Sequence, residues 1–342
     1  MAADSVLDGV FAINKPYGMS SAQVIRDCKT YFNPSKTFQP MLESEKAARA
    51  KESNFQQKRR RRVKQAVEVK MGHGGTLDPM ATGVLILGCG KGTKALSSFL
   101  GCTKTYETVV VFGASSDSYD RCGKLLKNRP YDHITKEKVL EAMEAFKGTY
   151  QQMPPLFSAL KMDGKPLYEY AREGKPIPRE IQTREVTVTD MEMGKGPPAV
   201  KVRMTATSGF YVRSFAHDLG ERLGSAGLMT ELVRSRQGDF VLGGPNCLEY
   251  DDLARGEDVW GPQVAGMLRR WNQPGGVNGG EKEALQKVEE KKEHVPKSSP
   301  SAPQGSPKRE ATPTRRSPSP KREGSPKRTT GEEPAVQAEA AL

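Results

Sequence analysis

Two segments of this 342-residue chain can contribute little to a folded core, and they limit where the fold can lie. Residues 33–70 hold eleven Lys/Arg against four Asp/Glu, and residues 273–342 hold thirteen against ten, so together they carry most of the formal charge of +12. The second segment is rich in Pro and Ser and repeats Ser-Pro-Lys-Arg at Ser306, Ser319 and Ser325. Segments of this kind bury too little apolar surface to offset the entropy of ordering.

We therefore expect one folded domain over residues 1–255, with a basic, disordered insertion at about 33–69 and a disordered tail at 256–342. Excision of the insertion should leave the fold intact, because changes in loop length cost little free energy. Its run from Lys58 to Lys64 is a nuclear import signal, an RNA backbone contact, or a solvated surface without a role. The tail is either a solvated linker or a basic arm with proline-directed phosphorylation sites.

Charge and cysteine usage narrow the class of protein. A pI near 9.4 favours a polyanionic partner, either a nucleic acid or an anionic membrane. No apolar run approaches the ~18–20 residues of a membrane span. The N-terminus resembles neither a secretory signal nor a mitochondrial presequence. The five cysteines form no CxxC pair and lie near no His, so we expect reduced thiols in the cytosol or nucleus and no metal.

Outside the charged segments, local patterns mix strands and helices. Apolar or alternating runs predict strands at 10–13, 84–87, 105–112, 185–193 and 200–206. Capped, periodic apolar residues predict helices that start at Ser20 or Ser21, at Thr135 and at Phe215. Because these elements do not alternate as βαβ units, we expect an α+β fold with a mixed β-sheet flanked by helices.

The stretch Gly88–Thr93 suggests a phosphate-binding loop but does not satisfy the known patterns. A Walker loop needs a glycine where Leu85 stands, and a dinucleotide fingerprint needs one at Thr93. His73 and His217 belong to no HExxH motif or other ligand cluster. We therefore expect no cofactor.

The glycine-rich stretch Gly72–Gly83 has one carboxylate, Asp78, at its centre. Its four glycines permit close approach of the backbone to a ligand, and Pro79 restricts the backbone of Asp78. A carboxylate on a tight loop before a buried strand can act as a nucleophile or a base. From the residues alone, Asp78 is either such a group or an ordinary turn residue.

The wider string closely resembles the signature loop of the TruB family of RNA pseudouridine synthases. The resemblance continues in family order over about residues 9–243, the insertion excepted, and this joint match is far more specific than any single motif. It implies the pseudouridine synthase fold, with a central active-site cleft, and an isomerase that needs no metal or redox partner. The further matching segments are Asn14–Ser21, Lys104–Tyr106, Ser116–Asp120, Tyr150–Gly174 and Gly209–Ser214.

The resemblance also implies roles for individual residues. Asp78 matches the catalytic carboxylate, which acts on the uracil or its ribose so that the glycosidic bond breaks and re-forms at C5. Tyr106 matches the Tyr that stacks on the flipped base and relays a proton, and Arg213 matches the Arg that pairs with the carboxylate. The other expected substrate-binding residues are His73 beside the RNA, Asp117 near Arg213, Leu232 in the base pocket, and Tyr211 of the Gly-x-Tyr-Ile-Arg motif.

One departure from the bacterial pattern bears on the substrate. After Tyr250 the chain has neither the length nor the strand pattern of the C-terminal RNA-binding module that bacterial members carry. In this it is similar to stand-alone fungal members, and unlike relatives that work with guide RNA. The basic insertion and tail are then expected to supply the extra RNA affinity.

We accordingly expect uridine 55 in the T loop of tRNA as the target, with T-loop-like hairpins in messenger RNA as a further substrate. A non-catalytic RNA chaperone is the competing interpretation. The expected partners are tRNA and messenger RNA, without guide RNA or membrane. We expect a monomer in the nucleus, with the mitochondrion and cytoplasm as further compartments.

Overall fold

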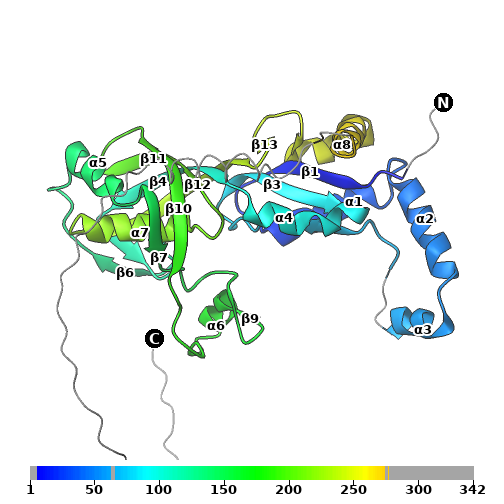
Figure 1. The fold of residues 1–342 in the computed structure, drawn as a ribbon, viewed down its shortest axis with the longest axis horizontal. Coiled ribbons are helices and arrows are strands. Elements are labelled where there is room, and N and C mark those ends of the chain that lie inside the picture. Colours follow the sequence, from blue (N-terminus) through cyan, green and yellow to red (C-terminus); the bar gives the residue numbers. More distant parts are fainter. Residues whose placement is uncertain (1–5, 63–65, 274–275, 277–342) are drawn as a thin grey trace, which may run out of the picture. The chain divides into compact units, whose positions relative to one another are not determined.

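The computed structural model describes residues 6–62, 66–273 and 276, and ten strands within them form one mixed sheet (Figure 1). The order is β14-β1-β3-β12-β4-β11-β10-β7, with β2 paired to β3 and β13 paired to β12. The pairs β1–β14 and β3–β12 are parallel, and the others are antiparallel. The strands are β1 (Gly9–Lys15), β2 (Met71–His73), β3 (Thr82–Cys89), β4 (Lys104–Phe112), β7 (Gly148–Gln152), β10 (Arg184–Met193), β11 (Ala199–Ala206), β12 (Gly227–Gln237), β13 (Phe240–Val241) and β14 (Cys247–Glu249).

Short hairpins and helices complete the described part of the chain. The hairpins pair β5 (Ala114–Ser116) with β6 (Leu125–Asn128), and β8 (Lys161–Met162) with β9 (Lys165–Pro166). The α-helices are α1 (Ser21–Phe32), α2 (Gln39–Ala50), α3 (Asn54–Arg62), α4 (Leu96–Gly101), α5 (Lys136–Glu144), α6 (Leu167–Arg172), α7 (Val212–Arg222) and α8 (Glu257–Trp271), and the 3₁₀ helices are η1 (Gly90–Lys94) and η2 (Tyr250–Arg255). The α+β class and the mixed sheet expected from the sequence are confirmed, and so are the caps of α1 at Ser20 and of α5 at Thr135.

Strand β12 joins two halves of the sheet. Along most of its length it pairs antiparallel with β4, and near its end it pairs in parallel with the start of β3, at Val233–Thr82 and Arg234–Gly83. A side chain at Gly83 would lie 2.3 Å from the carbonyl oxygen of Arg234, and its φ is +100°. Only glycine therefore allows the two halves to meet this closely.

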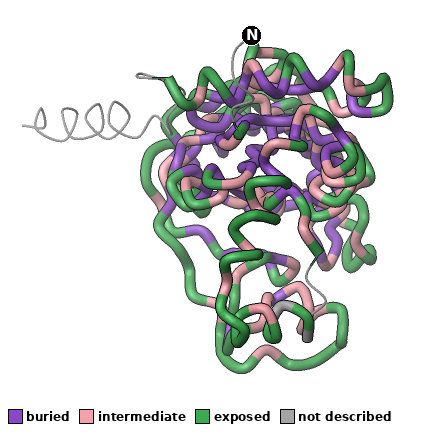
Figure 2. The backbone as a smooth tube through the Cα atoms, turned by 90° about the vertical axis from the view of Figure 1, so that its right-hand side faces the viewer, coloured by how far each residue is buried: buried purple, intermediate pink, exposed green. Residues whose placement is uncertain are grey.

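Strands β1 and β3 are buried on both faces, which explains their uninterrupted apolar runs. In β1, Phe11 and Ile13 face one core cluster, and Val10 and Ala12 face the other. Helices α1 and α8 contribute to the first cluster, and α4 contributes to the second (Figure 1). The buried backbone in Figure 2 accordingly follows the sheet and the helices packed on it.

The first part of the expected insertion is folded, which corrects the sequence-based prediction. Phe38 is fully buried, with its ring centroid 4.7 Å from that of Phe32, and Met41 and Leu42 of α2 also enter the core. Phe32 in turn lies 4.7 Å from Trp260 of α8. These apolar residues are few within a polar stretch, and their burial depends on partners far away in the sequence.

The boundary expected at residue 255 is also wrong, because α8 continues the fold to Trp271. Its buried side chains include Trp260, Val264 and Leu268, which recur at the four-residue spacing of a helix face. Gly261 and Pro262 obscure this pattern in the sequence. The expected disorder of the rest of the tail, and the absence of a C-terminal module there, concern residues that lie outside the described part.

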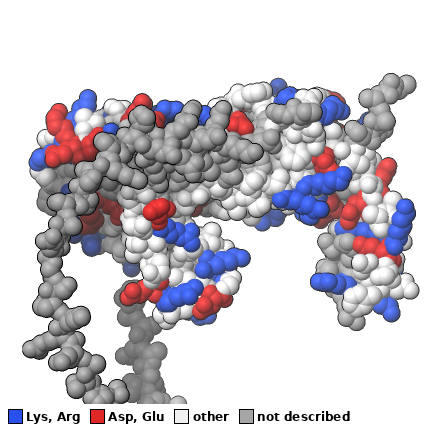
Figure 3. All heavy atoms as spheres, in the orientation of Figure 1, with Lys and Arg blue, Asp and Glu red and all other residues white. Residues whose placement is uncertain are grey.

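Helix α3 differs from α2 in burying little apolar surface. Phe55 is 77% exposed, and Lys58, Arg59 and Arg61 are exposed as well. Figure 3 shows basic side chains over α2 and α3, mixed with acidic ones. Within the described residues, no helix is both long enough and apolar enough to cross a bilayer.

Two phenylalanines of the same segment give a matched test of this packing. Phe38→Ala should lower the free energy of unfolding by about 3–5 kcal/mol, because it leaves a cavity between Phe32 and Trp260. Phe55→Ala, at an exposed site, should change it by less than about 0.5 kcal/mol. Urea denaturation of the full chain measures both changes. Equal effects would mean that the segment before α2 is not part of the core.

Candidate active site

The loop between β2 and β3 is held through its backbone carbonyl groups. Ser21 accepts from the Leu77 N–H at 2.9 Å and donates to the Leu77 carbonyl at 3.1 Å. Gln237 Nε2 donates to the Gly74 carbonyl at 2.7 Å. The Lys15 ammonium group and the Gly18 N–H both donate to the Pro79 carbonyl, at 3.2 and 2.8 Å. Donors from α1, β12 and β1 thereby position the one residue of the loop that carries a carboxylate.

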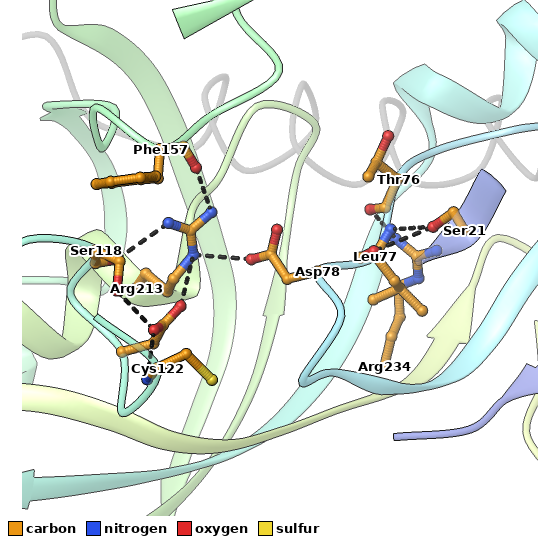
Figure 4. Close-up of polar contacts among 10 residues, drawn as sticks. Ser21, Thr76, Leu77, Asp78, Ser118, Cys122, Phe157, Arg213 and Arg234 are labelled. Atoms are coloured by element: carbon orange, nitrogen blue, oxygen red, sulfur yellow. Dashed lines mark hydrogen bonds and ion pairs between the residues drawn. The ribbon is translucent and has the colours of Figure 1, made fainter. Parts of the chain in front are cut away.

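Arg234 of β12 also holds this loop through its carbonyl groups. Its side chain is buried at 2% exposure and donates to the carbonyls of Val84 at 2.8 Å, Gly75 at 3.2 Å and Thr76 at 3.4 Å. In Figure 4 it lies on the opposite side of Asp78 from Arg213. Burial lowers the pKa of Arg234, and the nearby Tyr106 and Asp78 oppose that shift.

Asp78 forms an ion pair with Arg213, as expected. Arg213 Nε lies 2.8 Å from Asp78 Oδ2 (Figure 4). The guanidinium also donates to the Ser118 carbonyl at 3.1 Å and to the Phe157 carbonyl at 2.8 Å, so every one of its nitrogens has a partner. The Arg213 side chain is 6% exposed, while that of Asp78 is 33% exposed. The carboxylate of Asp78 is therefore accessible, and the guanidinium that holds it is buried.

The acidic residue beside Arg213 is Asp120, and not the expected Asp117. Asp120 Oδ2 lies 3.8 Å from Arg213 Nε, while Oδ1 accepts from the Ser118 hydroxyl at 2.6 Å and from the Cys122 N–H at 2.9 Å. Asp117 instead accepts from the Lys124 N–H at 2.9 Å. Between them Tyr119 has a φ of +63°, which reverses the chain and turns Asp120 towards the site.

Tyr106 lies opposite Arg234 in the β4–β12 register. Its side chain is buried, and burial raises its pKa, although the charge of Arg234 and a hydrogen bond to it act in the opposite direction. The phenol is therefore neutral at physiological pH. Leu232 is two residues away along β12, shares that face of the strand, and is 7% exposed.

His73 and Tyr211 are the remaining substrate-binding residues expected from the sequence. His73 ends β2, and its pKa is lowered first by burial and second by Arg234, which keeps the ring neutral. Its Nδ1 is buried and has no hydrogen-bond partner among the described residues. Tyr211 caps α7 and is bonded through its backbone to both ends of the Gln152 amide, at 2.8 and 3.0 Å. These bonds set the start of the helix that carries Arg213.

The sequence-based prediction missed Lys15, Asp120 and Arg234. Lys15 is fully buried, and burial lowers its pKa to about 8 although Asp78 acts against the shift. Arg234 lies on the same buried face of β12 as Leu232. A charged residue at a position where the strand pattern predicts burial could have identified Arg234 as a candidate site residue from the sequence. The described residues hold no group of three or more His, Cys, Asp or Glu suited to a metal ion.

Comparisons with known proteins identify relatives of this chain. Residues 59–212 match the family model described as TruB family pseudouridylate synthase (N terminal domain). The chain is 33% identical to tRNA pseudouridine synthase 4 of Schizosaccharomyces pombe, over 74% of this chain and 84% of the relative. It is 30% identical to tRNA pseudouridine synthase 4 of Saccharomyces cerevisiae, over 77% and 85%. Pseudouridylate synthase TRUB1 of Mus musculus is 38% identical, over 69% and 64%.

A solved structure shares the fold. The crystal structure of a Cbf5-Nop10-Gar1 complex contains a chain that superposes with a TM-score of 0.51 and 23% identity, over 76% of this chain and 60% of that one. The two fungal relatives match over most of their length and of this chain. The chain therefore belongs to the TruB family of pseudouridylate synthases.

Proposed function

We propose that this chain isomerises uridine to pseudouridine at position 55, in the T loop of tRNA, with Asp78 as the catalytic carboxylate. The observation that carries the proposal is the pair of Arg213 and Asp78, in which a buried guanidinium holds an accessible carboxylate at 2.8 Å. The two fungal relatives are named tRNA pseudouridine synthase 4, which supports tRNA as the substrate.

The reaction breaks the bond between C1′ and N1 and forms a bond between C1′ and C5. C5 loses a proton and N1 gains one, so the atoms balance without an oxidant or reductant. Asp78 Oδ2 is engaged by Arg213, and no described residue donates to Oδ1. One oxygen thus anchors the carboxylate, while the other is free to act on the uracil or its ribose.

The neighbouring side chains suit a base that has left its stack. Extrusion of a nucleotide costs a few kcal/mol, and an aromatic platform returns ~1–3 kcal/mol per base. Tyr106 supplies an aromatic ring next to Arg234, and its neutral hydroxyl relays the proton released from C5. Leu232 gives the pocket an apolar wall. The neutral His73 packs against the RNA where the base leaves the loop.

The same chemistry extends to any RNA that presents a T-loop-like hairpin, so messenger RNA belongs to the proposed substrates. The basic run from Lys58 supports RNA contact and a nuclear location. A role limited to folding RNA would need neither the Asp78–Arg213 pair nor the buried Tyr106. Assays on the Asp78 variant separate the catalytic and the non-catalytic roles.

Asp78→Asn should abolish turnover and leave RNA affinity nearly unchanged. The amide keeps the shape of the side chain but cannot act as the nucleophile or base. Release of tritium from C5-labelled uridine in an unmodified tRNA transcript measures turnover, and a transcript with cytidine at position 55 is the control. Product formation by the variant within tenfold of the unmodified enzyme would contradict the role of Asp78.

Arg213→Lys should lower the single-turnover rate at least tenfold. Lysine offers one point charge, whereas Arg213 engages Asp78 and two carbonyls at fixed angles. Arg129→Lys is the matched control, because Arg129 forms a 2.9 Å ion pair with Glu221 at 37% exposure. The control should react at the normal rate. If both variants reacted at the same rate, the geometry of Arg213 would not matter to the chemistry.

Combined replacement of Lys58, Arg59 and Arg61 by Ala should flatten the salt dependence of RNA binding. Each phosphate contact contributes roughly 0.7–0.9 to the slope of log affinity against log salt, so three contacts give a change of about 2. Ala at Lys147, Lys201 and Arg203, which are exposed elsewhere, removes the same charge and should change the slope less. An unchanged slope in the first variant would leave nuclear import as the role of the basic run.

A further inference from the structure

An exposed tyrosine and an exposed arginine lie against each other beside the active-site loop. The guanidinium carbon of Arg121 is 5.0 Å from the centre of the Tyr17 ring. Tyr17 is 56% exposed, and Arg121 is exposed as well. Neither residue takes part in the proposed chemistry, and neither supports the core.

Tyr17 is fixed to the loop that carries Asp78. It lies in the turn after β1, two residues after the buried Lys15 and directly before Gly18. The Gly18 N–H donates to the carbonyl of Pro79 at 2.8 Å, and the Lys15 ammonium group donates to the same carbonyl at 3.2 Å. Because Pro79 directly follows Asp78, the Tyr17 ring stands at the border of the site.

Arg121 is fixed to the other side of the site. It follows Asp120, which lies 3.8 Å from Arg213, and its own N–H donates to the Met229 carbonyl of β12 at 3.0 Å. The next residue, Cys122, donates its N–H to Asp120. The backbone of Arg121 is therefore held next to the carboxylate that faces Arg213.

The charge of Arg121 is not matched by a carboxylate. Among the described residues it forms no ion pair, as is also true of exposed arginines such as Arg172, whereas Arg203 and Arg255 each have an acidic partner. Its described partner is the face of an aromatic ring, which leaves the N–H groups at the edge of the guanidinium available. A cation with free donors beside an exposed ring suits a nucleotide, which offers a phosphate and a flat base.

We propose that Tyr17 and Arg121 form a subsite for the nucleotide next to the flipped uridine, with Arg121 on its phosphate and Tyr17 stacked on its base. The inference rests on the proposed function, because it assumes an RNA whose target base reaches Asp78. The subsite holds the flanking backbone while the uridine is out of its stack. It would thus set how tightly the RNA binds, and Asp78 would set how fast it reacts.

The competing interpretation is a clip that merely joins the turn after β1 to the loop after β5. Several hydrogen bonds already hold both segments, as described above, and an exposed cation–ring pair adds little to them. The two interpretations differ in their measurable effects. A clip acts on stability and on the rate of the reaction, whereas a subsite acts on RNA affinity and its salt dependence.

The experiment uses the full chain, a T-arm stem–loop RNA, and the variants Tyr17→Ala, Tyr17→Phe and Arg121→Ala, with Arg255→Ala as the control. Affinity is measured in the Asp78→Asn background, and single-turnover rates at saturating RNA are measured in the active enzyme. Tyr17→Ala should weaken binding about 5- to 100-fold, and Tyr17→Phe should bind normally. Arg121→Ala should reduce the salt slope by roughly 0.7–0.9. Rates should stay within about twofold.

A change in the RNA identifies the contact. An abasic residue is placed in turn at the 5′ and 3′ neighbours of the target uridine, and affinity is measured again. At one of these positions the Tyr17→Ala effect should disappear, because the base on which Tyr17 stacks is already absent. A methylphosphonate at the adjoining linkage should remove the Arg121→Ala effect in the same way.

Distinct outcomes separate this proposal from the function on which it rests. If the unmodified chain releases no tritium from the stem–loop or from full tRNA, the proposed function fails. If it does, but the Tyr17 and Arg121 variants bind with normal affinity and salt slope, the subsite alone is overturned. Lower rates or melting temperatures with unchanged affinity would likewise overturn it, in favour of the clip.

Discussion

Arg234 places a positive charge inside the sheet, where the loss of hydration costs several kcal/mol unless polar groups replace the water. The polar groups that replace this water are the carbonyls of Gly75 and Thr76 in the active-site loop and the carbonyl of Val84 near the start of β3. The loop is therefore ordered by the same contacts that make the buried guanidinium tolerable. If the loop moved away, it would leave an uncompensated charge in the core, which typically costs 3–5 kcal/mol.

Arg213 has a different relation to the carboxylate. It touches Asp78 directly and is itself held by two carbonyls and by Asp120, so the charge that faces the carboxylate has little freedom to turn. The two arginines come from neighbouring structural elements, α7 and β12, which the chain connects by only a few residues. One of them fixes the backbone of the loop and the other fixes its reactive side chain.

Much of this could be predicted from the sequence, and the exceptions have physical causes. The mixed sheet, the caps of α1 and α5, and the pairing of Asp78 with Arg213 follow from local patterns and from the resemblance to a family. Asp120 was missed because the left-handed backbone of Tyr119 changes which carboxylate points inward, and nothing in the local spacing reveals that.

The folded parts of the insertion and tail were missed for another reason. Phe38 and Trp260 pack against each other and against Phe32 in the core, and such contacts between distant segments cannot be seen in a local pattern. The average composition of a segment reflects its most abundant residue types and does not reveal a few apolar side chains that become buried. A few apolar residues can still anchor a segment whose side chains are mostly polar.

The pairing of β1 with β14, and the packing of α8 onto β1 and α1, have a consequence for protein synthesis. Strand β3 is complete at residue 89, but α8, one of the helices that cover this half of the sheet, ends at residue 271. At ~5–20 residues per second, the ribosome needs roughly 10–35 s to make the intervening chain. During that interval α1 and α4 can already cover β1 and β3, but the apolar surface against which α8 packs has no native partner and is open to non-native contacts.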